Sequence, residues 1–131
     1  IVIEDSFTDK STLYSYAYEL FRSGKYSESE NKFREFLALY PNDDLSDNAM
    51  YWIGEIYYSK GEYRKSINFM EDLISKYPQG NKVPDAHFKI ALGRYELGDK
   101  KGAVETLKSL LVNFPDSEIS GKVESKLKEW E

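Results

Sequence analysis

Residues 48–63 read NAMYWIGEIYYSKGEY and place five aromatic side chains in one short stretch. Apolar or small residues recur there at the i, i+3, i+4, i+7 spacing of one helical face, as Met50, Ile53, Gly54 and Tyr57. Gly61 follows, and glycine is typical of the residue just beyond a helix end. The stretch therefore predicts an amphipathic helix that stops at a glycine turn.

The glycine turn recurs at a fixed interval along the chain. Gly24, Gly61 and Gly98 are 37 residues apart, and an aromatic-proline pair keeps the same interval in Tyr40-Pro41, Tyr77-Pro78 and Phe114-Pro115. A repeat of this length indicates stacked supersecondary units, each of which needs its neighbours to bury its apolar face. The chain is therefore predicted to hold three copies of one unit.

Each unit contains two helical stripes, one before the glycine and one that ends before the proline. The predicted fold class is all-α, with helix-turn-helix repeats of period 37 at about 11–41, 47–78 and 84–115. Ser46 is predicted as the N-cap of the helix at 47, and Pro84 suits the first turn of another. A narrow stripe of Ile119, Val123, Leu127 and Trp130 predicts a capping helix at about 117–131. Residues 1–10 match no repeat and are interpreted as a linker remnant, so the repeat domain is 11–131.

The middle unit resembles the tetratricopeptide repeat (TPR), whose signature is W-x2-L-G-x2-Y, then A-x3-F, then P. It supplies Met50-x2-Ile53-Gly54-x2-Tyr57, then Ser66-x3-Met70, then Pro78. The resemblance implies a right-handed α-α superhelix (a TPR solenoid), in which the small residues Ala17, Gly54 and Ala91 allow two helices to cross closely.

Several residues depart from the TPR pattern. Ser29 and Ser66 replace the alanine of the helix crossing, and Lys100 replaces an aromatic residue of the turn. Arg94 stands where the family has an apolar residue. This arginine predicts that the core of the third unit is partly open or holds an ion pair.

In the TPR family, one face of the first helix of each unit lines a concave groove that binds partner polypeptides. Carried over by alignment, this partner-binding groove consists of Tyr14, Tyr18, Phe21, Tyr51, Glu55, Tyr58, Phe88, Leu92 and Tyr95, with Trp52 near its edge. Tyr57 and Tyr63 are predicted to pack between helices. Exposed aromatic clusters commonly mark interaction sites, and the alternative is that these rings only pack neighbouring repeats together.

Charge and composition exclude several other functions. The net charge of −5 opposes nucleic-acid binding, which depends on lysine and arginine. The chain has no cysteine, so it has neither disulfides nor thiolate chemistry. It lacks an apolar run of the roughly 20 residues that span a bilayer, so no direct membrane insertion is expected.

Catalytic and metal sites are not expected either. His87 is the only histidine and stands where the TPR family places a large buried aromatic residue, so a packed, hydrogen-bonded ring is favoured over a catalytic one. The acidic loop NDDLSD at 42–47 lacks the spacing of a calcium loop. We expect no enzyme activity, no metal and no cofactor.

The groove also lacks the Lys, Asn and Arg clamp with which chaperone-binding TPR proteins hold a terminal carboxylate. The ligand is therefore expected to be a protein or peptide that offers apolar groups, or cationic groups attracted by ring faces and by Glu55, Asp85 and Glu96.

Within the TPR family, residues 12–131 resemble the C-terminal repeat domain of the periplasmic Tol-Pal system proteins, or cell-division coordinators. The runs YPNDDLSDNAMYWIGEIYYSKGEY, VPDAHFKIALGRYELGDK and NFPDS carry this resemblance. It implies a periplasmic scaffold that couples outer-membrane constriction to septal peptidoglycan synthesis. Such a scaffold would bind Tol-complex and peptidoglycan-synthase components, and would oligomerise through an N-terminal coiled coil missing here. The alternatives are an outer-membrane protein assembly lipoprotein with similar repeats and a generic cytoplasmic TPR adaptor.

Overall fold

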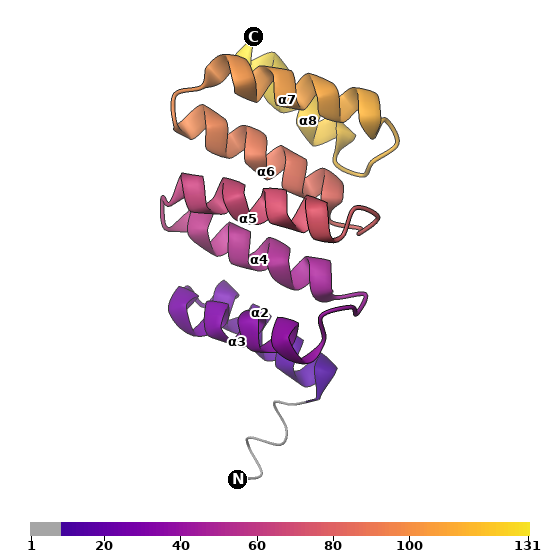
Figure 1. Ribbon diagram of the computed structural model, residues 1–131. Helices are drawn as coiled ribbons and strands as arrows, with labels where there is room; N and C mark the ends of the chain where they lie inside the picture. The colour runs from indigo at the N-terminus through magenta and orange to yellow at the C-terminus, as the bar shows by residue number, and fades with distance from the viewer. Residues whose placement is uncertain (1–8) are drawn as a thin grey trace.

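The computed structural model describes residues 9–131, and these residues form helices and no strand. The helices are α2 (Lys10–Arg22), α3 (Tyr26–Leu39), α4 (Ser46–Ser59), α5 (Tyr63–Lys76), α6 (Val83–Glu96), α7 (Lys100–Asn113) and α8 (Ser120–Trp130). Figure 1 shows them stacked along one direction, with α2 at one end and α8 at the other. The expected all-α repeat fold is confirmed. The interpretation of residues 1–8 as a linker lies outside the described residues, and Lys10 is already the first residue of α2.

Glycine turns separate the two helices of each unit, as the sequence predicts. Gly24, Gly61 and Gly98 have φ angles of 78°, 79° and 92°, a region that other residues rarely adopt. Pro84 lies in the first turn of α6. Ser46 is not an N-cap, however: it is the first residue of α4, and its hydroxyl donates to the Tyr40 carbonyl at 2.6 Å.

The helices form two layers. Each helix packs against the next one along the chain, and α2 also contacts α4, as α4 contacts α6. These contacts place the first helices of the units on one side, here called the inner surface. The second helices α3, α5 and α7 form the opposite side, here called the outer surface and seen from the front in Figure 1.

Small residues sit where the two helices of a unit cross. A Cβ atom at Gly54 would lie 2.5 Å from the Met70 methyl group, so any side chain there would displace Met70. The buried Ser66 hydroxyl donates to the Gly54 carbonyl at 2.8 Å, and Ser29 makes the same bond to the Ala17 carbonyl. Serine can therefore stand in place of the family's alanine at these crossings, because its buried hydroxyl is hydrogen-bonded.

The linkers between units pack against one another rather than project into solvent. Asp47 is buried in the first turn of α4 and accepts a hydrogen bond from the Lys82 backbone N–H at 2.8 Å. The Tyr77 hydroxyl donates to the Pro41 carbonyl at 2.6 Å. Together the two bonds join the linker before α4 and the first turn of that helix to the equivalent linker before α6, and they hold these two units at a fixed spacing.

Candidate protein-binding surfaces

The inner surface begins with an aromatic cluster where α2 meets α4. The Trp52 ring centroid lies 5.0 Å from that of Tyr18 and 5.1 Å from that of Phe21. The indole N–H of Trp52 donates to the Tyr14 hydroxyl at 2.9 Å. All four side chains are half-buried, so each presents part of a ring to solvent while its neighbours hold it in place.

An ion pair occupies the equivalent junction between α4 and α6. Lys89 Nζ lies 2.7 Å from a carboxylate oxygen of Glu55 and 4.3 Å from the centre of the Tyr58 ring. The period of 37 aligns Lys89 with Trp52, so a lysine covers this junction where a tryptophan covers the first. Burial raises the pKa of Tyr58 to about 12, and the nearby carboxylate of Glu96 adds to the shift.

The third junction combines α6 with the capping helix. The Tyr95 and Trp130 rings are stacked 4.3 Å apart with their planes 4° from parallel. Leu92 is half-buried in the same cluster, and Tyr95 is 37% exposed. The capping helix therefore completes the inner surface as well as closing the core.

Two of the predicted groove residues are buried instead. Tyr51 is 9% exposed and Phe88 is 8% exposed, so the prediction that they line an open surface is wrong. Their neighbours explain the difference: Tyr51 belongs to a core cluster with Val83 and Ile90 of α6, and Phe88 to one with Val123 of α8. Lys82 and Lys122 also lie 5.0 Å and 5.8 Å from the centres of the two rings. Burial also raises the pKa of the Tyr51 phenol.

The lysines of the inner surface change the chemistry expected of a ligand. Lys82 and Lys89 already lie over the rings of Tyr51, Trp52 and Tyr58, and Glu55 is already paired. A cationic ligand would have to displace these contacts. The exposed apolar ring edges of the aromatic cluster are therefore the main groups that a ligand could contact. Sequence reasoning missed these lysines, although the alignment of Lys89 with Trp52 was available from the period.

Asn48 is a further residue of interest at the start of α4. Its side-chain amide donates weakly to the Tyr14 hydroxyl at 3.4 Å, while its Oδ1 atom is buried with no hydrogen-bond partner. A buried amide oxygen without a donor costs free energy.

The outer surface has a notch between α3 and α5, here called the first notch, which Tyr57 and Phe69 fill. Their ring centroids are 5.7 Å apart. The Tyr57 hydroxyl donates to Glu30 at 2.6 Å and accepts from Arg34 at 2.9 Å. Burial alone would raise the pKa of Glu30, but the hydrogen bonds from Tyr57 and Arg34 outweigh burial and lower it. As predicted, Tyr57 is buried, whereas Tyr63 is half-buried against Tyr58.

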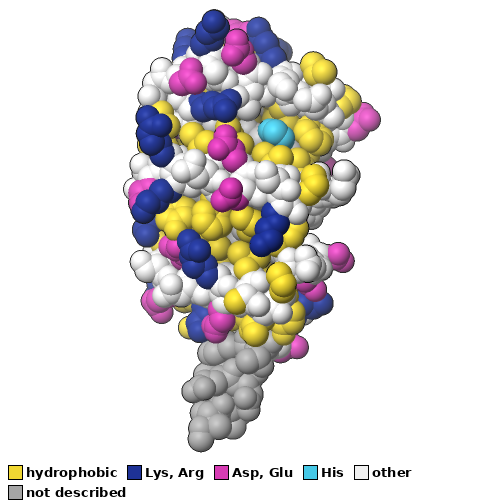
Figure 2. Space-filling model, viewed as in Figure 1, with side chains coloured by type: hydrophobic (Ala, Val, Ile, Leu, Met, Phe, Trp, Pro, Cys, Tyr) yellow, Lys and Arg dark blue, Asp and Glu magenta, His cyan; other side chains and the backbone are white. Residues whose placement is uncertain are grey.

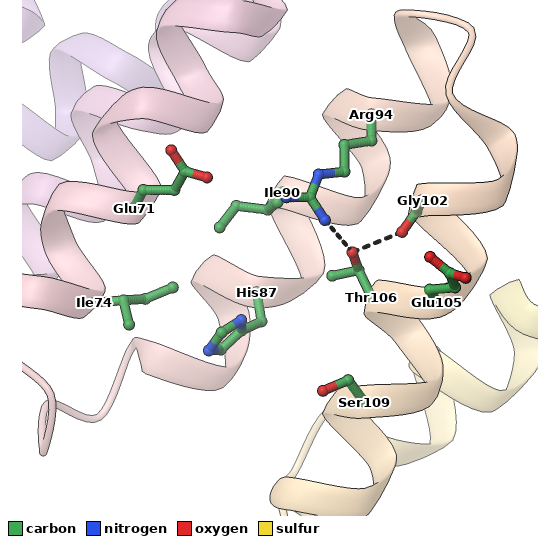
Figure 3. A pocket seen from close by; sticks show the side chains of 9 residues that line it. All are labelled: Glu71, Ile74, His87, Ile90, Arg94, Gly102, Glu105, Thr106 and Ser109. Carbon is green, nitrogen blue, oxygen red and sulfur yellow. Dashed lines mark hydrogen bonds between the residues drawn. The ribbon is translucent and has the colours of Figure 1, made fainter.

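The corresponding notch between α5 and α7, here called the second notch, is open. It is a cavity of about 450 Å³. Its lining residues are Glu71, Ile74, His87, Ile90, Arg94, Gly102, Glu105, Thr106 and Ser109. Figure 3 shows these residues on α5, α6 and α7, with Arg94 bonded to Thr106 and Thr106 bonded to the Gly102 carbonyl. Figure 2 shows the histidine beside exposed hydrophobic side chains on this face.

The sequence prediction for this region holds in part. The third-unit core is open at Arg94, as expected, but within residues 9–131 Arg94 forms no ion pair and instead donates to Thr106. The His87 ring packs against Phe114 with centroids 5.7 Å apart and has no described hydrogen bond. Burial lowers the pKa of His87, and the charge of Arg94 lowers it further.

No group of three or more potential ligands is placed to hold a metal ion in the described part of the chain. Among the helices described, none combines the length and apolar character needed to cross a membrane. The stacked helical pairs define a TPR-type helical repeat fold.

Residues 8–130 match the YfiO family of outer membrane lipoproteins, and the chain belongs to this family. No curated protein sequence matches the chain significantly.

Solved structures of TPR-type proteins are similar over most of the chain. The type III secretion translocator chaperone SycD of Yersinia enterocolitica is 25% identical, with a TM-score of 0.75 over 92% of this chain and 90% of the other. SycD in complex with a peptide of the translocator YopD is 24% identical with a TM-score of 0.73, over 92% and 90% of the two chains. The TPR2AB domain of yeast Sti1, in a complex with pHSP90, is 18% identical with a TM-score of 0.74, over 92% of this chain and 48% of that one.

Proposed function

We propose that the chain is a non-catalytic scaffold of the bacterial cell envelope that binds an extended polypeptide along its inner surface. The observation that carries this proposal is the half-exposed cluster of Tyr14, Tyr18, Phe21 and Trp52, whose rings hold one another in fixed positions. Rigid aromatic side chains lose little conformational entropy on binding and bury a large area, which makes them effective anchors.

The geometry suits a ligand segment with apolar side chains. These side chains would pack on the exposed ring edges between α2 and α4. At the next junction, between α4 and α6, the ligand would meet the Glu55–Lys89 ion pair. Its side chains there would have to fit beside one negative and one positive group. The SycD and Sti1 structures contain a YopD peptide and pHSP90, which supports a polypeptide ligand for a fold of this kind.

Two envelope roles are distinguished by their partners. The resemblance of residues 40–63 and 83–100 to the cell-division coordinators supports a Tol-Pal role, in which the ligands are Tol-complex and peptidoglycan-synthase components. Membership of the outer membrane lipoprotein family instead supports outer-membrane protein assembly. Photo-crosslinking from position 18 in a bacterial envelope would separate them, since the captured proteins differ in each case. Capture of cytoplasmic proteins alone would favour the cytoplasmic adaptor and contradict both envelope roles.

The binding surface itself is tested by removing two half-buried phenols. Replacing Tyr18 and Tyr58 with Ala should weaken capture of the cross-linked partner at least tenfold, because each ring supplies exposed contact area. Tyr51 is unsuitable for this test because it is buried. Val112→Ala is the control: Val112 lies on α7 and is 77% exposed, so the change removes apolar area elsewhere.

A spectroscopic measurement locates binding directly. The chain has two tryptophans, so a Trp130→Phe variant reports only the emission of Trp52. Partner binding on the inner surface should shift that emission. A partner that binds the variant with unchanged affinity and leaves the emission unaltered would place its site elsewhere.

A further inference from the structure

The second notch is the repeat equivalent of the first, but it lacks the side chains that fill the first notch. The 37-residue period aligns Tyr57 with Arg94, Phe69 with Thr106, and Lys65 with Gly102. In the first notch these residues are a phenol ring, a second ring packed against it, and a lysine whose Nζ lies 5.7 Å from the centre of the phenol ring. The second notch has neither ring and no lysine cover, and a cavity of about 450 Å³ takes their place.

The first notch also shows how this architecture holds a phenol. One carboxylate accepts the Tyr57 hydroxyl hydrogen and one guanidinium donates to its oxygen, at 2.6 Å and 2.9 Å. A phenol buried with both bonds made has no unsatisfied polar atom, which avoids the main cost of burying a hydroxyl.

The second notch holds both kinds of group at different repeat positions: the period aligns Glu71 with Arg34, and Arg94 occupies the position of the phenol itself. Glu71 from α5 and Glu105 from α7 supply carboxylate acceptors, and Arg94 supplies the guanidinium. Within residues 9–131 no carboxylate pairs with Arg94, and the His87 ring has no described hydrogen bond. Ile74 and Ile90 provide the apolar walls that a ring requires. We propose that the second notch binds a tyrosine side chain of a partner polypeptide.

Charge complementarity favours a neutral aromatic group with one hydroxyl over other ligands. Two carboxylates in the lining disfavour a phosphate or carboxylate, and Arg94 disfavours a cation. A tyrosine side chain uses both signs of charge, as Tyr57 does in the first notch. The site lies on the outer surface, so it is independent of the proposed function of the inner surface.

A titration with a minimal ligand tests the site. N-acetyl-tyrosinamide, added to the isotope-labelled chain, should produce saturable NMR shifts at Ile74, His87 and Thr106 with a Kd on the order of 1 mM, as for small ligands in open sites. N-acetyl-phenylalaninamide is the matched control. It lacks the hydroxyl and should bind about 5- to 10-fold more weakly, the equivalent of one hydrogen bond.

Rebuilding the first notch within the second should block the site. The double variant Arg94→Tyr with Thr106→Phe places both missing rings in the cavity, so N-acetyl-tyrosinamide binding should fall more than tenfold while the melting temperature rises. Thr106→Phe alone fills part of the cavity and provides a second variant should the double one not fold. Unchanged affinity in a folded variant, no saturable shift in the wild type, or shifts confined to residues around Trp52 would each overturn the proposal.

The source of the tyrosine is a separate outcome of the same experiment. The chain alone is diluted, and the NMR signals of Ile74, His87 and Thr106 are followed. If these signals change with concentration and sedimentation detects dimers, the notch binds a tyrosine of a second copy, and the partner proposal is overturned. A concentration-independent monomer that binds N-acetyl-tyrosinamide supports it.

Discussion

The first and second notches share a backbone arrangement but differ in what fills them. In the first, Tyr57 and Phe69 close the space between α3 and α5, and the phenol hydroxyl is fully hydrogen-bonded. In the second, Arg94 and Thr106 occupy the equivalent positions and leave a cavity. A repeat protein can therefore turn a packed joint into a binding site by exchanging a few side chains, because the helical pairs on both sides support the joint.

The largest effect is expected from Gly54→Arg, which disrupts the helical pair beside the first notch. The new side chain would collide with Met70 and carry a charge into the core, so the free energy of unfolding should fall by about 4 kcal/mol or more. Thermal unfolding measures this. Gly121→Arg is the control, since nothing lies within 4 Å of a Cβ there, and it should leave the melting curve nearly unchanged. Equal curves for wild type and Gly54→Arg would contradict the helix crossing.

Truncation at the aligned positions compares the two notches directly. Tyr57→Ala removes a buried ring and two hydrogen bonds, and should lower the free energy of unfolding by about 3 kcal/mol. Arg94→Ala borders an existing cavity and should cost less than about 1 kcal/mol. Urea unfolding of both variants gives the difference. Similar losses at both positions would show that the second notch is packed as tightly as the first.

A smaller effect is expected where α4 crosses α5. Ser66→Ala removes the buried hydrogen bond to the Gly54 carbonyl and should cost about 1 kcal/mol. Ser75→Ala on the same helix is the control, because Ser75 is exposed. The period aligns Ser66 with Ala103 of the third unit. The variant therefore gives the helix crossing of the second unit the same residue as the crossing of the third unit. A change no larger than that of the control would mean that the bond contributes nothing net.

The smallest effect concerns His87 of the second notch, which the period aligns with the buried Met50. Its folded-state pKa lies below the ordinary value of 6.5, because the ring is partly buried and faces the positive charge of Arg94. The unfolded chain therefore binds the proton more readily. The contribution of neutral His87 to the free energy of unfolding is therefore fully present above pH 6.5. It should decline as the pH falls towards the folded-state pKa.

NMR titration of the single histidine checks this assignment. The midpoint should lie below 6.5, because burial and the charge of Arg94 both lower the pKa of His87. Glu71 of α5 and Glu105 of α7 line the same notch and carry the opposite charge. His87→Met should remove this part of the pH dependence. A midpoint above 6.5 would mean that these carboxylates dominate over burial and Arg94.

Sequence patterns were sufficient for the fold but only partly for the surfaces. Helical spacing and the 37-residue period located the glycine turns and the capping helix, because these depend on backbone geometry and local residue type. The resemblance to the TPR pattern located the helix crossings, and the departure of Arg94 from that pattern predicted a core that is partly open or holds an ion pair. The pattern did not show that Arg94 would bond to Thr106, because that contact joins two helices.

What the sequence by itself determined is the repeated helical pair and the face on which each side chain lies. What only the tertiary structure decided is how far each side chain is covered. Helical rotation assigned Tyr51 to the inner face, yet the ring is buried in a core cluster with Val83 and Ile90 of α6. Helical spacing is a property of one segment, whereas burial depends on side chains from the next unit. The fold could therefore be read from a pattern, but the open surfaces required all the helices in place.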